Sequence, residues 1–361
     1  MNIKYIFSSL LFIFTAITVF SQTISYKIID NHGKVWTTEK ANEWYKRRKW
    51  LTGANYIPAN AVNQLEMWQA DTFDPITIDK ELGWAQSIGF NTLRVFLHSI
   101  VYKQDAQGFK NRIHRFLQIA DKHHIQPLFV FFDDCWNRDP QPGKQPEPKP
   151  GMHNSGWMQD PGDPGYKDSA RIAELEMYVR DILFSFAHDK RILMWDLYNE
   201  PGNQGKNDAV LPLLQKVFYW ARAVNPDQPV TAGLWSWRLE TINRFLIANS
   251  DIITYHNYEE PQAHQKVIQI LQSFGRPLIC TEYMARTHNS RFNNVLPMLK
   301  KENTGAINWG LVAGKTNTIY SWEEKLSDGR LPAEWFHDIF KKDGTPYRQD
   351  EVDLIKQLNG L

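Results

Sequence analysis

The stretch MWDLYNEP, residues 194–201, has the composition of a buried strand that ends on a carboxylate. Apolar and aromatic residues surround Asp196, and the run then stops at Asn199, Glu200 and Pro201. Proline has no N–H and disfavours helical geometry in the residue before it, so Pro201 predicts an extended conformation for Glu200. The stretch therefore indicates a buried strand that presents a carboxylate at its tip.

Seven further runs of this kind recur along the chain, each preceded by a helix-like stretch. The eight runs are GANYIP (53–58), FNTLRVFL (90–97), IQPLFVFF (125–132), ILMWDLYN (192–199), QPVTAGLW (228–235), DIITYHNY (251–258), RPLICTEY (276–283) and GAINWGLV (305–312). Near-continuous apolar strands separated by helices are typical of a parallel sheet covered on both faces. Eight such units predict an α/β protein with a single (β/α)8 barrel, the TIM barrel fold. An open doubly wound sheet is the alternative, but GANYIPANA (53–61) lacks the glycines of its phosphate-binding turn.

The start of the chain predicts a secretory signal peptide over residues 1–21. A basic residue, an uncharged apolar run and a small polar end follow one another there. The apolar run, residues 5–20, is shorter than the roughly 20 residues that a membrane-spanning helix needs. We therefore expect cleavage near residue 21, which leaves residues 22–361 as one secreted or periplasmic domain with no membrane attachment.

Charge and cysteine content exclude several classes of partner. The chain has 361 residues and a formal net charge of +1, which gives no overall field to attract nucleic acid or an anionic membrane. Cys135 and Cys280 lie far apart, in or beside apolar runs, which favours two free buried thiols over a disulfide. The two cysteines have no CxxC spacing of the kind that binds zinc. The adjacent pair His123 and His124 precedes the third strand, so it lies at the end of the barrel opposite the expected active site. The sequence thus predicts no metal site.

The segment 137–165 departs from the strand–helix rhythm. It is dense in proline and glycine, so its composition predicts an irregular loop. Because it follows the third strand, it would lie on the C-terminal face, where barrel active sites are built. His153 and Trp157 within it favour a loop that faces a substrate over a passive insertion.

Polar and aromatic side chains gather at the C-terminal ends of the predicted strands, which meet at one face of a barrel. They are Arg94, His98, Asp133, Asp134, Trp136, Asn199, Glu200, Trp235, Trp237, His256, Tyr258, Glu282 and Trp309. Any one of them is readily explained as a satisfied polar group at a strand end, but the whole set on one face indicates a site. The chain also has 14 tryptophans, whose flat apolar faces stack on sugar rings.

Two carboxylates, Glu200 and Glu282, end the fourth and seventh strands, so their tips can face each other across the barrel mouth. Cleavage of a glycosidic bond needs such a pair, because one carboxyl protonates the leaving oxygen and the other attacks the anomeric carbon. Arg94 and Tyr258 are placed to direct donors at Glu282, which would lower its pKa.

The neighbours predict a different setting for Glu200. We expect Asn199 and His256 to hold it in more apolar surroundings, which would raise its pKa. The roles that follow are nucleophile for Glu282 and acid/base for Glu200.

Several motifs together resemble a known family. NEP after the fourth strand, HNY in the sixth, CTEY in the seventh and the Trp of AINWG in the eighth resemble the retaining glycoside hydrolases of clan A. They are most similar to glycoside hydrolase family 5, the cellulase and mannanase group, and the arginine of TLRVFL is also in place. The resemblance spans the whole mature chain. It implies an enzyme that cleaves β-glycosidic bonds of a β-glucan or β-mannan type poly- or oligosaccharide by double displacement, without metal or organic cofactor, and the predicted signal peptide makes this a secreted enzyme.

The resemblance also implies roles for individual residues. These are acid/base for Glu200, nucleophile for Glu282, binding of the sugar 2-hydroxyl for Asn199, orientation and tuning of the carboxylates for Arg94, His256 and Tyr258, and a platform under the sugar before the cleaved bond for Trp309. Many members carry a histidine at the end of the third strand, where this chain has FFDDCW (131–136), so Asp133, Asp134 or Trp136 takes its place. A catalytically inactive barrel that binds glycans is the alternative, and loss of either glutamate would be its signature.

Overall fold

The computed structural model describes residues 35–162 and 168–361. The predicted signal peptide, residues 1–21, lies outside the described residues. Within the described residues, no helix is both long enough and apolar enough to cross a membrane.

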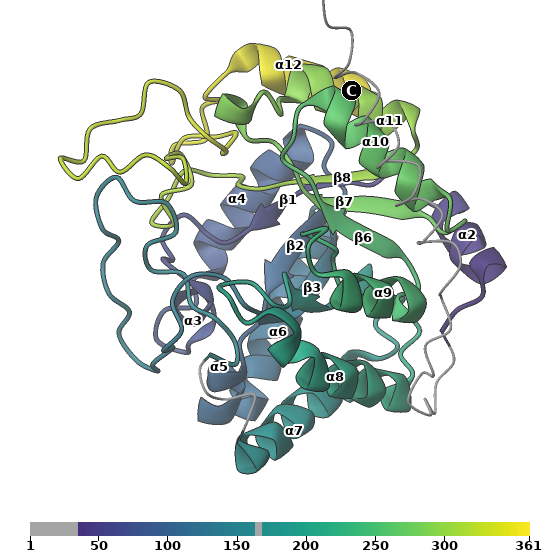
Figure 1. The fold of residues 1–361 in the computed structure, drawn as a ribbon. Coiled ribbons are helices and arrows are strands. Elements are labelled where there is room, and N and C mark those ends of the chain that lie inside the picture. Colours follow the sequence, from purple (N-terminus) through teal and green to yellow (C-terminus); the bar gives the residue numbers. More distant parts are fainter. Residues whose placement is uncertain (1–34, 163–167) are drawn as a thin grey trace, which may run out of the picture.

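Eight parallel strands form a barrel surrounded by helices, which confirms the predicted (β/α)8 fold (Figure 1). Each strand overlaps one of the eight predicted runs. The strands are β1 (Thr52–Tyr56), β2 (Thr92–Phe96), β3 (Gln126–Asp133), β4 (Met194–Asn199), β5 (Val230–Thr231), β6 (Ile253–His256), β7 (Leu278–Glu282) and β8 (Gly305–Asn308). The long α-helices are α4 (Pro75–Ser87), α6 (Ala106–Lys122), α7 (Ser169–Phe186), α8 (Leu211–Val224), α9 (Glu240–Asn249), α10 (Pro261–Gln272), α11 (Phe292–Lys301) and α12 (Gln349–Asn359). Shorter helical elements are α2 (Thr38–Lys46), α3 (Gln64–Trp68), α5 (Ser99–Gln104), η1 (Asn207–Val210) and η2 (Arg286–His288).

The sheet runs in the order β5-β4-β3-β2-β1-β8-β7-β6, with parallel pairing throughout. A single parallel bridge between Leu234 and Tyr255 closes the ring between β5 and β6. Two backbone hydrogen bonds support it, from Leu234 N–H to Thr254 at 3.0 Å and from His256 N–H to Leu234 at 2.8 Å. Because the strands are parallel, their C-terminal ends meet at one mouth.

The inside of the barrel changes from apolar to polar along its axis. At the N-terminal end, Leu128, Met194 and Ile307 form a buried cluster with Ala41 and Tyr45 of α2, so this helix covers the bottom of the barrel. Nearer the mouth, the inward positions carry charged and polar groups, which need buried partners. The fold therefore places its polar groups together at the C-terminal ends of the strands.

The long segments after β3 and β8 cover part of this mouth. Residues 137–162 contain no helix or strand, which confirms the predicted irregular loop over its described part. In Figure 1 this teal segment and the yellow segment 313–348 lie beside each other.

Candidate active site

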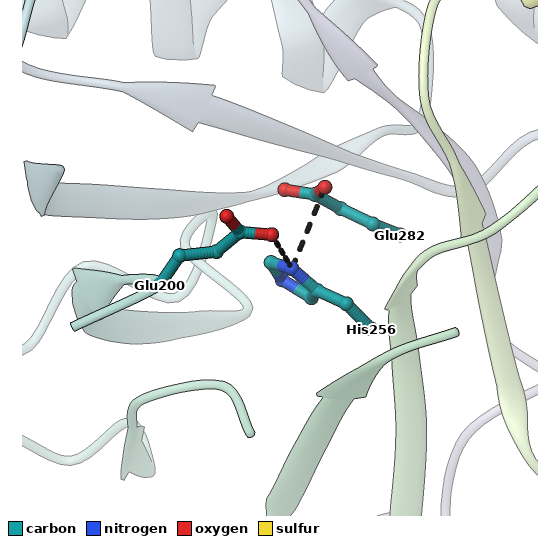
Figure 2. Close-up of side chains that lie close together, drawn as sticks. All are labelled: Glu200, His256 and Glu282. Atoms are coloured by element: carbon teal, nitrogen blue, oxygen red, sulfur yellow. Dashed lines mark hydrogen bonds and ion pairs between the residues drawn. The ribbon is translucent and has the colours of Figure 1, made fainter. Parts of the chain in front are cut away.

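Glu200, His256 and Glu282 form a cluster of titratable groups at the mouth (Figure 2). His256 and Glu282 are the last residues of β6 and β7, and Glu200 directly follows β4. The ring atom Nδ1 of His256 lies 2.8 Å from Oε1 of Glu200 and 3.4 Å from Oε2 of Glu282. One ligand atom from each of the three residues lies within 4.8 Å of the others. Carboxyl groups of retaining glycosidases are about 5–5.5 Å apart and those of inverting enzymes about 6.5–9.5 Å, so this spacing fits retention.

Glu282 receives the donors that the sequence predicts. Its Oε1 accepts from Nη1 of Arg94 at 2.8 Å and its Oε2 accepts from the hydroxyl of Tyr258 at 2.9 Å. The expected fall in its pKa is wrong, however. Burial raises the pKa of Glu282 and the nearby carboxyl of Glu200 raises it further, against the opposing effects of His256, Arg94 and Tyr258.

The backbone at Glu200 differs from the prediction. We expected an extended conformation before Pro201, but the φ of Glu200 is +45°, in the left-handed region. A turn begins at this residue, and Asn203 N–H closes it by donating to the carbonyl of Glu200 at 3.1 Å. Such a conformation costs a non-glycine residue about 1–3 kcal/mol, and functional sites are where such strain concentrates.

The side chain of Glu200 also has different partners from those expected. Its Oε2 accepts from Nδ2 of Asn203 at 2.5 Å and from the thiol of Cys135 at 3.1 Å, in addition to the contact of Oε1 with His256. The expectation that Asn199 holds it is wrong, because the Asn199 side chain instead accepts from Arg94 and donates to Asp133. Burial raises the pKa of Glu200, as predicted, while the donors from Cys135 and Asn203 partly oppose the rise.

Arg94 is fully buried at the centre of the polar network. Besides Glu282, its guanidinium donates to Asp196 at 2.8 Å, to Asn55 at 2.9 Å and to Asn199 at 2.7 Å. One buried cation thus contacts two buried carboxylates, which is the way such charges are tolerated in a protein interior. Arg94 therefore fixes the position of Glu282 from below.

His256 is neutral at ordinary pH, because burial lowers its pKa to about 4. Its Nε2 has no hydrogen-bond partner among the described residues. The proton is therefore assigned to Nδ1, which donates toward Glu200. Nδ1 of His256 thus lies between the two carboxyl groups, within 3.4 Å of each.

Asp133 supports the site through other side chains. It accepts from Nδ2 of Asn199 at 2.9 Å and from Nε1 of Trp157 at 2.7 Å, while Cys135 N–H donates to it at 2.8 Å. Burial raises its pKa to about 6. Asp133 thus positions the amide of Asn199 and joins the loop after β3 to the strand ends.

Four of the predicted residues do not line the pocket: Arg94 and Asp133, described above, and Asp134 and His98. Asp134 accepts from Tyr198, Gly202 and Lys206, so it anchors the turn after Glu200 from behind. His98 is buried, and its Nδ1 accepts from the N–H of Ile100 at the start of α5. Both are structural supports of the mouth.

An open pocket of about 500 Å³ extends above the carboxyl pair, and tryptophans form much of its lining. The predicted Trp136, Trp235 and Trp309 all line it. Cys135, Asn203 and Trp322 also line it, and none of the three belongs to the predicted set. The predicted free, buried thiol of Cys135 is confirmed, and its contact with Glu200 is a feature that the sequence does not predict. Asn203 lies three residues after Glu200. A turn predicted over residues 200–203 would have placed its side chain close to Glu200.

Glu200, His256 and Glu282 are close enough together to hold a cation. Their contacts disfavour this, because the guanidinium of Arg94 already neutralises Glu282 and Nδ1 of His256 already donates to Glu200. Carbohydrate chemistry by the two carboxyls needs no ion.

A (β/α)8 barrel with a close carboxyl pair in a tryptophan-lined pocket defines a class, the barrel glycoside hydrolases. Residues 84–315, more than half of the chain, match the family described as Cellulase (glycosyl hydrolase family 5), and the chain belongs to this family. The protein is therefore a retaining glycoside hydrolase. A search of curated proteins finds no match to the sequence.

Solved structures of similar fold include several proteins that act on mannosides. An exo-β-1,4-mannosidase from Opitutaceae bacterium strain TAV5 has a TM-score of 0.61 and 17% identity, over 93% of this chain and 62% of that one. An endo-1,4-β-D-mannanase from Thermotoga petrophila RKU-1 has a TM-score of 0.56 and 15% identity, over 86% and 99% of the two chains. An endo-1,4-β-mannanase from Rhizomucor miehei has a TM-score of 0.55 and 14% identity, over 86% and 94%. At these identities the likeness concerns the fold, and the chain spans less than two thirds of the Opitutaceae protein.

Proposed function

We propose that the protein hydrolyses β-mannosidic bonds in a poly- or oligosaccharide, with Glu282 as nucleophile and Glu200 as acid/base. The observation that carries the proposal is the asymmetric pair itself. Both carboxyls contact Nδ1 of His256, but only Glu282 receives a guanidinium, at 2.8 Å, whereas Glu200 receives neutral donors. A cationic donor favours the ionised form, so Glu282 is the carboxyl that gives up its proton first. The choice of mannose over glucose rests on the similar structures, which are named for mannosidase and mannanase activity.

In the first step, an ionised oxygen of Glu282 attacks the anomeric carbon while the bond from that carbon to the leaving oxygen breaks. Glu200 transfers its proton to the leaving oxygen, and the shortened chain departs. The charge on Glu282 is consumed as the ester bond to the sugar forms, and the charge now resides on Glu200. Asn203 and Cys135 both donate to Oε2 of Glu200, so they stabilise this new anion.

In the second step, Glu200 takes a proton from a water molecule, whose oxygen attacks the anomeric carbon from the side that the leaving group vacated. The ester bond to Glu282 breaks, and the carboxylate returns to the donors of Arg94 and Tyr258. Two displacements at one carbon give a product with the β configuration of the substrate.

The location of the enzyme is a further part of the proposal. The predicted signal peptide over residues 1–21 would direct it to the periplasm or the medium, where polysaccharides are encountered. A fusion of residues 1–30 to a reporter that is active only after export would test this part.

A hydrolysis screen on purified residues 22–361 tests the activity. The panel contains β-mannan, β-glucan, xylan and aryl β-glycosides, with Glu282→Gln as control. We expect sugar release from mannan and from the aryl β-mannoside that the substitution abolishes, and a first-formed product in the β configuration by NMR. An α product would mean inversion. A folded protein that binds glycans but releases nothing would favour the inactive glycan-binding barrel instead.

A further inference from the structure

We propose that the pocket is closed on the side of the non-reducing end, so that the enzyme removes one sugar unit at a time from that end. The inference rests on the proposed function, because it uses the roles of Glu200 and Glu282. Its basis is a wall of loops on one half of the barrel mouth, which we call the glycone wall. The wall consists of residues 57–66 after β1, 145–158 after β3 and 309–326 after β8.

Backbone and side-chain hydrogen bonds join the second and third segments of the glycone wall. The N–H of Asn154 donates to Thr316 at 2.8 Å, and the N–H of Leu326 donates to Gly151 at 3.1 Å. Nδ1 of His153 lies 2.8 Å from the carbonyl of Tyr320. Contacts through the backbone do not depend on flexible side chains, so the two segments form one continuous surface.

The backbone at Gly151 also packs closely against the segment after β8. Its φ is +63°, and a Cβ added there would lie 1.9 Å from the carbonyl oxygen of Leu326. Only glycine permits both this conformation and this approach. The junction between the two segments is therefore built tightly into the sequence.

The segment after β1 completes the glycone wall. Lys315 N–H donates to Ala59 at 3.0 Å, and its Nζ pairs with Glu66 at 2.8 Å. Nδ2 of Asn63 donates to Gln145 and to Gly156, both at 2.8 Å. The segments after β1, β3 and β8 thus form one hydrogen-bonded layer.

The space behind this layer is too small for a sugar. Trp157 and Trp309 meet edge to face with ring centroids 5.6 Å apart, and Phe96 packs against both. Asn154, Trp157 and Trp309 line both the open pocket and a second cavity behind them, and this second cavity measures about 20 Å³. A cavity needs roughly 10–15 Å³ to hold one water molecule, so this space accommodates about one water and no second sugar ring.

The opposite half of the mouth is open. Trp237, beyond the end of β5, is 45% exposed and lines the pocket. Gln204 after β4 and Glu259 after β6 line it as well, and both are exposed. A chain of several sugars can therefore leave the pocket over the ends of β4, β5 and β6.

The chemistry decides which end of the substrate faces the glycone wall. Glu200 protonates the leaving oxygen, so the departing chain lies on its side, next to Asn203 and Trp235. The sugar attacked by Glu282 then lies toward Trp309. Further units on the non-reducing side of that sugar would have to pass through Trp157 and Trp309, so that sugar must be the terminal one.

Product analysis on the wild-type enzyme tests the proposal. One substrate is β-1,4-mannohexaose, and the other is the same hexaose with a methyl group on O4 of its non-reducing terminal unit. We expect mannose as the first and only initial product from the free hexaose. The blocked hexaose should react at least about 100-fold more slowly, because the wall excludes the added group. Glu282→Gln on the free hexaose is the control for contaminating activity.

Each other outcome has a distinct meaning. A mixture of short oligosaccharides, or mannobiose as the sole early product, would overturn the closed end and leave the proposed hydrolysis intact. Equal rates on the free and blocked hexaose would do the same. No cleavage of either hexaose, nor of an aryl β-mannoside, would overturn the proposed function and the inference with it.

Discussion

The ends of β4 and β7 each present a glutamate to the same pocket, yet the two strands deliver it in different ways. Glu282 is the last residue of a regular strand, and a guanidinium fixed by Asp196 holds its side chain. Glu200 lies just past its strand in a left-handed turn, and its side chain is held by a thiol, an amide and an imidazole. A charged, rigid setting suits a group that must carry a negative charge before reaction. A neutral setting suits a group that must hold a proton first and lose it later.

The largest expected effect comes from exchanging each glutamate for glutamine. Glu282→Gln removes the nucleophile and should lower turnover by about 10⁴-fold or more on every substrate. Glu200→Gln should lose as much on mannan but far less in the first step with a dinitrophenyl β-mannoside, whose leaving group needs no proton. The burst of dinitrophenol released in the first step separates the two variants, because Glu200→Gln should show this burst and Glu282→Gln should not.

Azide sharpens this test, because it is a nucleophile that needs no general base. We expect azide to accelerate Glu200→Gln and to yield a β-glycosyl azide, with wild-type enzyme in azide as the reference. If Glu282→Gln behaved in this way and Glu200→Gln did not, the two roles would be exchanged.

A smaller but still large effect concerns stability. Arg94→Met leaves Asp196 and Glu282 buried without their cation, which should cost about 3–5 kcal/mol of unfolding free energy. Without the guanidinium, the folded-state pKa values of both carboxyls rise further above those of the unfolded chain. The loss should therefore be smaller at pH 5 than at pH 8, because a raised carboxyl pKa favours the folded state only while the group is protonated.

Urea unfolding at the two pH values measures this loss. Arg47→Met is the matched control, since Arg47 pairs with Glu43 on the surface with both side chains exposed. That substitution should change stability by no more than about 0.5 kcal/mol at either pH. Equal destabilisation by the two variants would show that the buried network has no special dependence on its cation.

A third effect concerns the neutral setting of Glu200. Cys135→Ala removes a donor 3.1 Å from its Oε2, and that donor favours the ionised carboxylate. The pKa of Glu200 should rise, so the basic limb of the kcat/KM profile should move to higher pH, with kcat lowered by about tenfold at most. Burial raises the pKa of the Cys135 thiol well above its ordinary value, so it stays a donor throughout this range.

Two further variants complete the thiol experiment. Cys135→Ser keeps a donor and should restore the position of the basic limb. Cys280→Ala removes the other buried thiol, whose Sγ contacts the backbone carbonyl of Glu282, and should leave the limb in place. A shift caused equally by Cys280→Ala would mean that loss of packing, and not the contact with Glu200, moves the pKa.

The comparison also explains which features the sequence could predict. The recurrence of apolar runs along the chain predicts the barrel, and the polar residues at the ends of these runs predict the two glutamates. The contacts of Arg94 and Tyr258 with Glu282 are also predicted, because they depend only on the order of the strands and on which strand residues face the inside of the barrel. The left-handed turn at Glu200 could not be predicted from Pro201, since the turn is fixed by tertiary contacts of Asp134 with Gly202 and Lys206. The net pKa of Glu282 was missed for a related reason, because burial depends on what packs around a residue and not on its neighbours in sequence.

The smallest expected effect lies on the open side of the pocket, beyond Glu200. Trp237→Ala removes an exposed aromatic face from the path of the departing chain, and one such face contributes about 1 kcal/mol. KM for mannohexaose should rise about fivefold, while KM for an aryl β-mannoside, which has no sugar there, should stay the same. Phe184→Ala is the control, because Phe184 is 77% exposed on α7 and does not line the pocket. Equal changes in KM for both substrates would place Trp237 beside the reacting sugar, and the division of the mouth into a closed side at Trp309 and an open side at Glu200 would then be wrong.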